Sequence, residues 1–315
     1  MSKRVLIAIV VLGVSTLSLA QGASFSVGPA TLSQASLIDC GAGSRTSALG
    51  RIRAEDGTQW TVPAPVNFDS ARKAADLFNQ CGAVRSSGTK ALDLETVPLI
   101  DAGGDEEFVA YVFADNYFEF YVNGKLLAVD AVPFTPFNSS VIRFKARRPV
   151  TLAFMAVDWE ENLGLGSERN RGQSHFPGDA GIVAVVQDAA GKTVSLTDAS
   201  WRAQTFYVAP LADRACLVEN GALRDSSACS TRGSNDGSGD AAAHWPLPAN
   251  WMQPGFDDRA WPQAVEFSND VVGVNGKPAY TNFTDIFDRE GADAQFIWSS
   301  NLVLDNLVLL RGGFR

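Results

Sequence analysis

Short apolar and aromatic runs, separated by turn residues about every ten positions, follow one another along most of the chain after residue 94. This rhythm is typical of a β-sandwich or barrel, and it predicts a mainly β fold. Asn123-Gly124 predicts a tight hairpin, because both residues tolerate positive φ. The expected strands are 107–114, 117–122, 125–130, 141–145, 150–157, 181–188, 193–197, 296–298 and 302–310.

The stretch 21–93 has a different pattern, which predicts a small, separate α+β unit. Residues 48–54 and 59–62 are its expected strands. Residues 69–81 place alanines and a phenylalanine at helical spacing, with Asp69 or Ser70 as a cap and Gly82 as a stop signal. They predict a helix.

We expect 94–315 to form one sandwich, with the small polar residues of 213–243 as an excursion loop.

Four cysteines lie after the first twenty residues, and an even count in an exported chain indicates disulfides. Three pairings are possible, and proximity in sequence favours Cys40–Cys81 and Cys216–Cys229. No CxxC motif occurs, and the two histidines are far apart in sequence, which argues against a histidine-based metal centre.

The first twenty residues have the three parts of a secretory signal peptide. Lys3 and Arg4 precede an uncharged apolar run at 5–19, and Ser18 and Ala20 are the small residues of a cleavage site. The alternative is an uncleaved membrane anchor, but the run is shorter than the ~20 residues that a bilayer span needs. We expect a secreted protein, extracellular or periplasmic, with no membrane span after cleavage.

Cleavage removes Lys3 and Arg4, which changes the formal net charge from −9 to −11. An acidic surface repels phosphate backbones and anionic lipids, so nucleic acid is not an expected partner.

Several segments occur in an order that resembles the N-terminal lectin-like domain of bacterial α-L-rhamnosidases, and more loosely other galactose-binding-like jelly rolls. A YVNG hairpin is followed by a strand that ends in an acidic and aromatic loop, then by a TDASW hairpin and an FDDRAW turn. The segments are 114–127, 150–164, 181–203, 254–264 and 296–311. The resemblance implies a jelly-roll β-sandwich, carbohydrate binding and a structural calcium ion. The residues before 94 are too few for the catalytic domain that accompanies such modules.

One acidic and aromatic run has the composition of a sugar site: Asp158, Trp159, Glu160, Glu161 and Asn162. A sugar site needs an apolar face for the C–H groups and acids or amides for the hydroxyls. The alternative is a solvated loop whose Trp159 packs on the sandwich rim. Trp201 and Trp261 each follow a polar turn and are expected to close the end of the sandwich.

Calcium takes six to eight oxygen ligands. The candidate ligands Asn235, Asp236 and Asp240 lie in a glycine-rich loop, and two further acidic runs occur at 105–107 and 257–258. None of these runs matches an EF-hand, and such runs are more often solvated turns.

Catalytic motifs such as GxSxG, a P-loop or HExxH are absent, although a pair of carboxylates for glycoside hydrolysis depends on the fold rather than on a motif. We therefore expect an exported, non-catalytic protein that binds a glycan or cell-surface polysaccharide, or attaches to a surface. The alternatives are a structural or assembly protein of the envelope or extracellular matrix, and a glycan-active enzyme.

Overall fold

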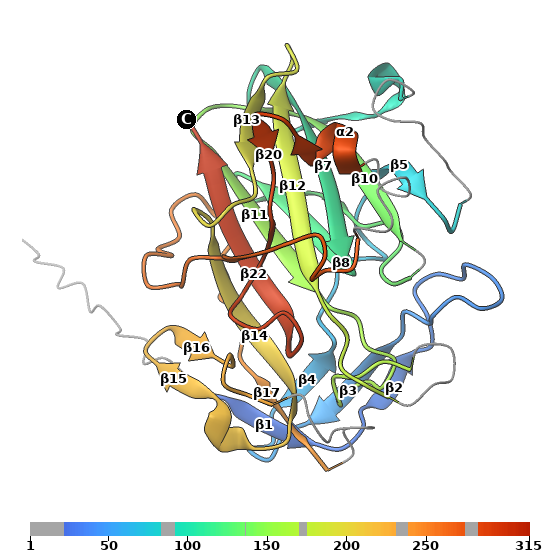
Figure 1. Ribbon diagram of the computed structural model, residues 1–315, viewed down its shortest axis with the longest axis vertical. Coiled ribbons are helices and arrows are strands. Elements are labelled where there is room, and N and C mark those ends of the chain that lie inside the picture. The colour runs from blue at the N-terminus through green and yellow to red at the C-terminus, as the bar shows by residue number, and fades with distance from the viewer. Residues whose placement is uncertain (1–21, 83–91, 136, 170–174, 231–238, 275–282) are drawn as a thin grey trace, which may run out of the picture.

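Two large sheets face each other in a β-sandwich (Figure 1). The computed structural model describes residues 22–82, 92–135, 137–169, 175–230, 239–274 and 283–315. The first sheet has seven strands in the order β1-β17-β14-β22-β11-β8-β9. Their bounds are β1 Ser24–Val27, β17 Ala241–His244, β14 Arg202–Leu211, β22 Asp305–Phe314, β11 Val150–Val157, β8 Tyr117–Val122 and β9 Lys125–Val129.

The second sheet has eight strands. Six follow the order β18-β21-β12-β7-β10-β5, while β13 pairs with β12 and β6 pairs with β10. Their bounds are β18 Val265–Phe267, β21 Phe296–Trp298, β12 Gly181–Asp188, β7 Glu106–Asp115, β10 Asn138–Ala146, β5 Ala75–Asn79, β13 Thr193–Leu196 and β6 Leu99–Asp101.

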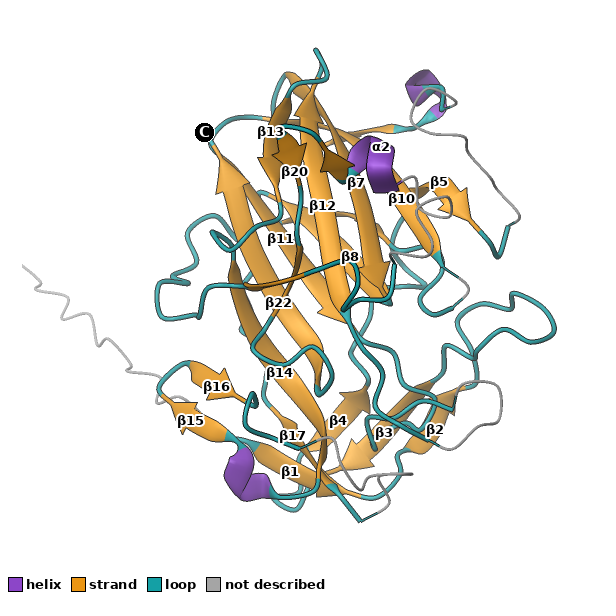
Figure 2. Cartoon of the chain, viewed as in Figure 1, coloured by secondary structure: helices purple, strands orange, loops and turns teal. Residues whose placement is uncertain are grey.

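A smaller sheet of three strands lies at one end of the long strands, near β1 and β17 (Figure 1). It consists of β2 (Thr31–Gln34), β3 (Leu49–Arg53) and β4 (Gln59–Val62). Within the described residues, helical structure is confined to short turns (Figure 2). The remaining elements are η2 (Leu94–Thr96), η4 (Arg214–Cys216), α2 (Phe283–Ile286), and the hairpins β15 (Val218–Asn220) with β16 (Leu223–Asp225) and β19 (Asp288–Arg289) with β20 (Ala292–Asp293).

The seven-stranded sheet is buried on both faces, which explains the aromatic residues at successive positions of β8. Phe118 and Phe120 belong to the core that also contains the apolar residues of the second sheet. Tyr117 and Tyr121 point to the other face and join a second core, together with Trp159. A strand covered on both faces carries apolar side chains throughout rather than alternating ones.

Most of the expected strands are confirmed, and so is the Asn123-Gly124 hairpin, where both residues have positive φ. The last strand begins three residues later than expected. Asn301 Oδ1 accepts the N–H groups of Val303 and Leu304, at 3.0 and 3.1 Å, and holds them in a turn. β22 therefore starts at Asp305 and continues to Phe314.

The expected helix at 69–81 is wrong. Its second half is β5, which pairs antiparallel with β10 at the edge of the eight-stranded sheet. Leu77 and Phe78 are buried there. An isolated helix of this length is marginal in water, so the hydrogen bonds and burial offered by the open sheet edge outweigh the helical pattern.

The expected separate unit at 21–93 is not observed. β1 pairs with β17 in the first sheet, and β5 pairs with β10 in the second. Only β2, β3 and β4 form a sheet of their own. Strands from this segment are therefore part of both large sheets, where they pair with strands that are distant in sequence.

Both expected disulfides are confirmed. Cys40 pairs with Cys81 and Cys216 pairs with Cys229, with Cα atoms 4.9 and 5.0 Å apart. The expected excursion loop at 213–243 is partly regular structure, because it contains the β15–β16 hairpin and ends in β17, a strand inside the first sheet.

No helix in the described part of the chain has the length and apolar character needed to cross a membrane. The expected signal peptide at 1–20 lies outside the described residues.

Candidate functional site

The acidic and aromatic run follows directly after β11, at the end of the sandwich that carries the β2–β3–β4 sheet. Trp159 is only 1 % exposed. Its indole N–H donates to the carbonyl of Ala48, at 3.1 Å, and its ring meets Tyr117 edge-on. The expectation that Trp159 offers a face to a sugar is therefore wrong: the ring belongs to the core.

Glu160 is also buried and fixes the loop that follows it. Its carboxylate accepts the Tyr207 hydroxyl, at 2.9 and 3.1 Å, and the Gly164 N–H, at 2.6 Å. Burial raises the pKa of Glu160 to about 7, although these hydrogen bonds act in the opposite direction. The carboxylate braces the fold from inside.

Asp158 lies in the same interior region. Burial raises its pKa well above the ordinary value, and three neighbouring carboxylates act in the same direction: Asp115, Asp179 and Glu160. The backbone on either side is held as well, because Asp158 N–H donates to Asn306 and Trp159 N–H donates to the Asn116 side chain.

Glu161 and Asn162 are half-buried. The Glu161 carboxylate accepts the backbone N–H of Arg169, and the Asn162 amide donates to Ser167 Oγ at 3.1 Å. Segment 158–169 is thus folded back on itself. Of the five predicted site residues, Glu161 is the one that lines the cleft described next.

That cleft, which we call the loop cleft, has a volume of about 540 Å³ and lies between this segment and the residues around β2 and β3. Its lining residues are Leu32, Ala35, Thr46, Ala48, Glu161, Leu163, Arg169 and His175. Apolar side chains therefore share the cleft with one acid, one hydroxyl, one guanidinium and one imidazole. Small-molecule sites combine an apolar lining with a few convergent polar groups in this way.

Sequence reasoning missed Arg169 and His175. The sequence shows His175 as one of two histidines, and its distance from His244 along the chain argues only against a histidine-based metal centre. An antiparallel backbone bridge between Glu168 and Phe176, eight positions apart, brings His175 near Glu161. A single isolated bridge produces no periodic pattern of apolar and polar residues, so the sequence contains no signal for it.

A second, acidic cleft of about 620 Å³ lies around the β19–β20 hairpin. Its lining includes four acids and one arginine: Asp270, Asp288, Glu290, Asp293 and Arg289. Asp288 is already engaged, because both of its oxygens accept the Asn269 amide at 3.0 Å. Solvated acids alone do not define a binding site.

The structure describes only part of the predicted calcium ligand set. Asn235 and Asp236 lie outside the described residues, while Asp240 is half-buried. Asp257 pairs with Arg259 at 2.6 Å, and Asp258 with Arg311 at 2.7 Å, so these two carboxylates already have cationic partners. Among the described residues, no three His, Cys, Asp or Glu side chains are grouped to hold a metal ion. Bound calcium stays a prediction.

Trp201 and Trp261 are buried, as expected, at 3 and 6 % exposure. The Trp201 indole donates to the Leu196 carbonyl at 2.9 Å, and Trp261 meets Phe206 and Phe256 edge-on. Both rings serve packing.

Comparisons of the chain with protein-family models, with curated proteins and with solved structures found no match. The chemistry of the loop cleft is therefore the basis for any functional conclusion.

Proposed function

We propose that this chain is an exported, non-catalytic protein that binds a carbohydrate in the loop cleft. The observation that carries the proposal is the mixed lining of that cleft, with aliphatic Leu32 and Leu163 beside the polar Glu161, Arg169 and His175. The aliphatic groups suit the C–H face of a sugar, and the polar groups suit its hydroxyls. In this proposal the site moves from the buried Trp159 to the surface next to it.

Export and the ligand class rest on separate support. The signal-peptide pattern at 1–20 and two disulfides suit an oxidising compartment outside the cytosol. The β-sandwich is compatible with the galactose-binding-like jelly roll that the sequence resembles, though such sandwiches host unrelated functions. A cell-surface polysaccharide is the partner that fits an exported binding protein.

The test is a glycan array followed by isothermal titration with residues 21–315, in calcium and in EDTA. We expect Glu161→Ala and His175→Ala to weaken the binding of a glycan hit about tenfold each, because each removes a hydrogen bond that involves a charged or polar group. Glu290→Ala in the acidic cleft is the matched control and should bind like the wild type. If no arrayed glycan binds under either condition, the proposal fails.

A second candidate is a scaffold protein of the envelope or extracellular matrix. The observation in its favour is the cover over the predicted sugar loop. Leu163 accepts the Ala30 N–H at 2.8 Å, and Trp159 donates to Ala48, so the β2–β3 region closes over the loop. A scaffold predicts self-association or cross-linking to envelope proteins without glycan binding, which analytical ultracentrifugation and cross-linking on cells would detect.

A glycan-active enzyme has less support. Asp158 and Glu160 are two nearby carboxyls with raised pKa values. Neither lines the loop cleft, and Glu160 is saturated by Tyr207 and backbone N–H groups. A general acid or base must reach the substrate, so these two carboxyls are better explained as interior braces.

A further inference from the structure

An apolar cavity opens at the edge of the eight-stranded sheet, away from the loop cleft. Its volume is about 240 Å³. β5 and β6 both pair with the same edge of β10, because β7 occupies the other edge. Val141 is paired with Ala75 and Arg143 with Leu99, and the cavity, which we call the edge cavity, lies where the two short strands meet.

The walls of the edge cavity are aliphatic and come from both sheets. Ala128 of β9 reaches it from the seven-stranded sheet, so the cavity extends into the space between the sheets. The aliphatic lining residues are Ala74, Ala75, Val97, Pro98, Ile100, Ala128, Val141 and Ile142. None of the described residues that line it is an acid.

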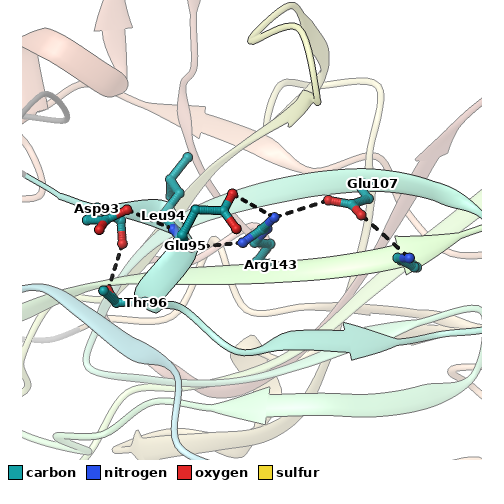
Figure 3. A network of polar contacts seen from close by, with 7 residues as sticks. Asp93, Leu94, Glu95, Thr96, Glu107 and Arg143 are labelled. Atoms are coloured by element: carbon teal, nitrogen blue, oxygen red, sulfur yellow. Dashed lines mark hydrogen bonds and ion pairs between the residues drawn. The ribbon is translucent and has the colours of Figure 1, made fainter.

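A polar network fixes one wall in place (Figure 3). Arg143 donates to the Leu94 carbonyl at 3.1 Å and pairs with Glu95 and Glu107, at 3.0 and 3.2 Å. These contacts tie η2 to β10, and Val97 and Pro98 follow η2 directly. The cavity is therefore formed before any ligand arrives.

Two cationic residues complete the lining, Arg72 and Lys73. The Lys73 ammonium is committed elsewhere: it lies 3.7 Å from the centre of the Phe68 ring and donates to the carbonyl of Ala71 at 3.3 Å. Arg72 is exposed, and its guanidinium makes no hydrogen bond or ion pair with the rest of the described chain. Arg72 thus places an exposed guanidinium, without a partner among the described residues, next to an apolar cavity, and such a group is suited to a carboxylate.

The volume sets the size of the ligand. A dry apolar cavity of about 150 Å³ is large enough to take up benzene. The edge cavity, at about 240 Å³, has room for a ring and a short chain.

We propose that the edge cavity binds a small monocarboxylate, whose aromatic or short aliphatic body fills the cavity and whose carboxylate pairs with Arg72. This site is independent of the glycan-binding proposal, because it shares no lining residue with the loop cleft.

The test uses isothermal titration of residues 21–315 with phenylpropionate and, as a matched neutral probe, phenylpropanol. Phenylpropionate should bind saturably and at least about tenfold more tightly than phenylpropanol, since a hydrogen bond to a charged group is stronger than a neutral one. Arg72→Gln should remove this preference. Ala75→Leu, which fills the cavity, should abolish binding of both probes.

Arg53→Gln and Ala190→Leu are the matched controls, because both residues are outside the cavity and exposed. Val97→Phe fills the cavity from the segment after η2 and replaces Ala75→Leu if thermal melting shows that the latter is unfolded. Absence of saturable phenylpropionate binding overturns the proposal, as does unchanged binding by a folded, cavity-filled variant. Equal affinity for the two probes overturns the role of Arg72.

Discussion

The loop cleft and the edge cavity are built from opposite kinds of structure. The loop cleft takes its polar groups from residues outside strands: Thr46 between β2 and β3, and Glu161, Arg169 and His175 between β11 and β12. The edge cavity takes its aliphatic walls from strands and from the turn that Arg143 holds. Loops can present polar groups to a hydroxylated ligand. Paired strands instead hold apolar walls in fixed positions, so a cavity between them selects a ligand by its size and shape.

The two regions also differ in what supports them. The loop cleft rests on buried polar and aromatic groups, Trp159 and Glu160, directly beneath its rim. The edge cavity rests on strand pairing and a surface ion network. We therefore expect substitutions beneath the loop cleft to cost far more stability than substitutions at the mouth of the edge cavity, and the following predictions test that difference.

Trp159→Ala should have the largest effect. It removes a fully buried ring and leaves the Ala48 carbonyl without its donor, so we expect the free energy of unfolding to fall by about 3–5 kcal/mol. Urea unfolding monitored by circular dichroism measures this. Glu161→Ala, at the half-buried rim, is the control and should lose only about 1 kcal/mol, because it removes one hydrogen bond, from the Arg169 N–H, and no buried ring. An unchanged stability of Trp159→Ala would contradict the placement of this ring in the core.

Loss of the Cys40–Cys81 bond should come next. The bond joins the region of the loop cleft to the end of β5, and it closes a loop with a sequence separation of 41. On the chain-entropy model, the double variant Cys40→Ser/Cys81→Ser should lose about 4 kcal/mol. The Cys216–Cys229 bond spans 13 residues and should be worth about 3 kcal/mol on the same model. Denaturant unfolding of the two double variants compares them, and a larger loss from the shorter loop would contradict the model.

The pH dependence of stability should report the burial of Glu160. Burial raises its pKa from 4.5 to about 7 on folding, so the folded state holds this proton more tightly than the unfolded state does. Its contribution to stability is fully present below pH 4.5 and is lost as the pH rises through about 7. Asp305, whose pKa burial also raises to about 7, adds a loss in the same direction.

Thermal melting between about pH 4 and pH 8 measures this slope. Glu160→Gln should reduce it, because the amide has no proton to lose in that range. Glu161→Gln is the matched control at the adjacent position and should keep the wild-type slope. A slope that is unchanged in Glu160→Gln would show that other groups account for it.

Arg72→Gln should have the smallest effect. The side chain is exposed and has no partner in the described chain, so stability should change by no more than about 0.5 kcal/mol. Urea unfolding checks this on the variant used for the phenylpropionate titration. A loss above about 1 kcal/mol would mean that Arg72 supports the fold, and weaker ligand binding would then have a structural cause.

Much of the fold was predictable because its signals are local. Asn123-Gly124 specifies its hairpin through backbone conformations that those two residues tolerate, and the cysteine pairs follow from proximity along the chain. The β-rich runs of β7, β8, β11 and β12 were readable for the same reason, since turn residues bound each of them. The secondary structure of 69–81 was not predictable in this way, because it depended on whether β10 had an unpaired edge with which these residues could form a strand.

The sequence by itself determined that the chain is a disulfide-linked, mainly β protein with an acidic charge and an acidic-aromatic run after β11. Only the tertiary structure decided that Trp159 is buried, with its indole N–H bonded to the Ala48 carbonyl. It alone also decided that Glu161, Arg169 and His175 line one cleft together with Leu32. The physical reason is that the exposure of a side chain depends on which distant segments of the chain pack against it. A tryptophan beside three acids has the same local sequence whether its ring contacts a sugar or another segment of its own chain. The pairing of distant strands decides between these two outcomes.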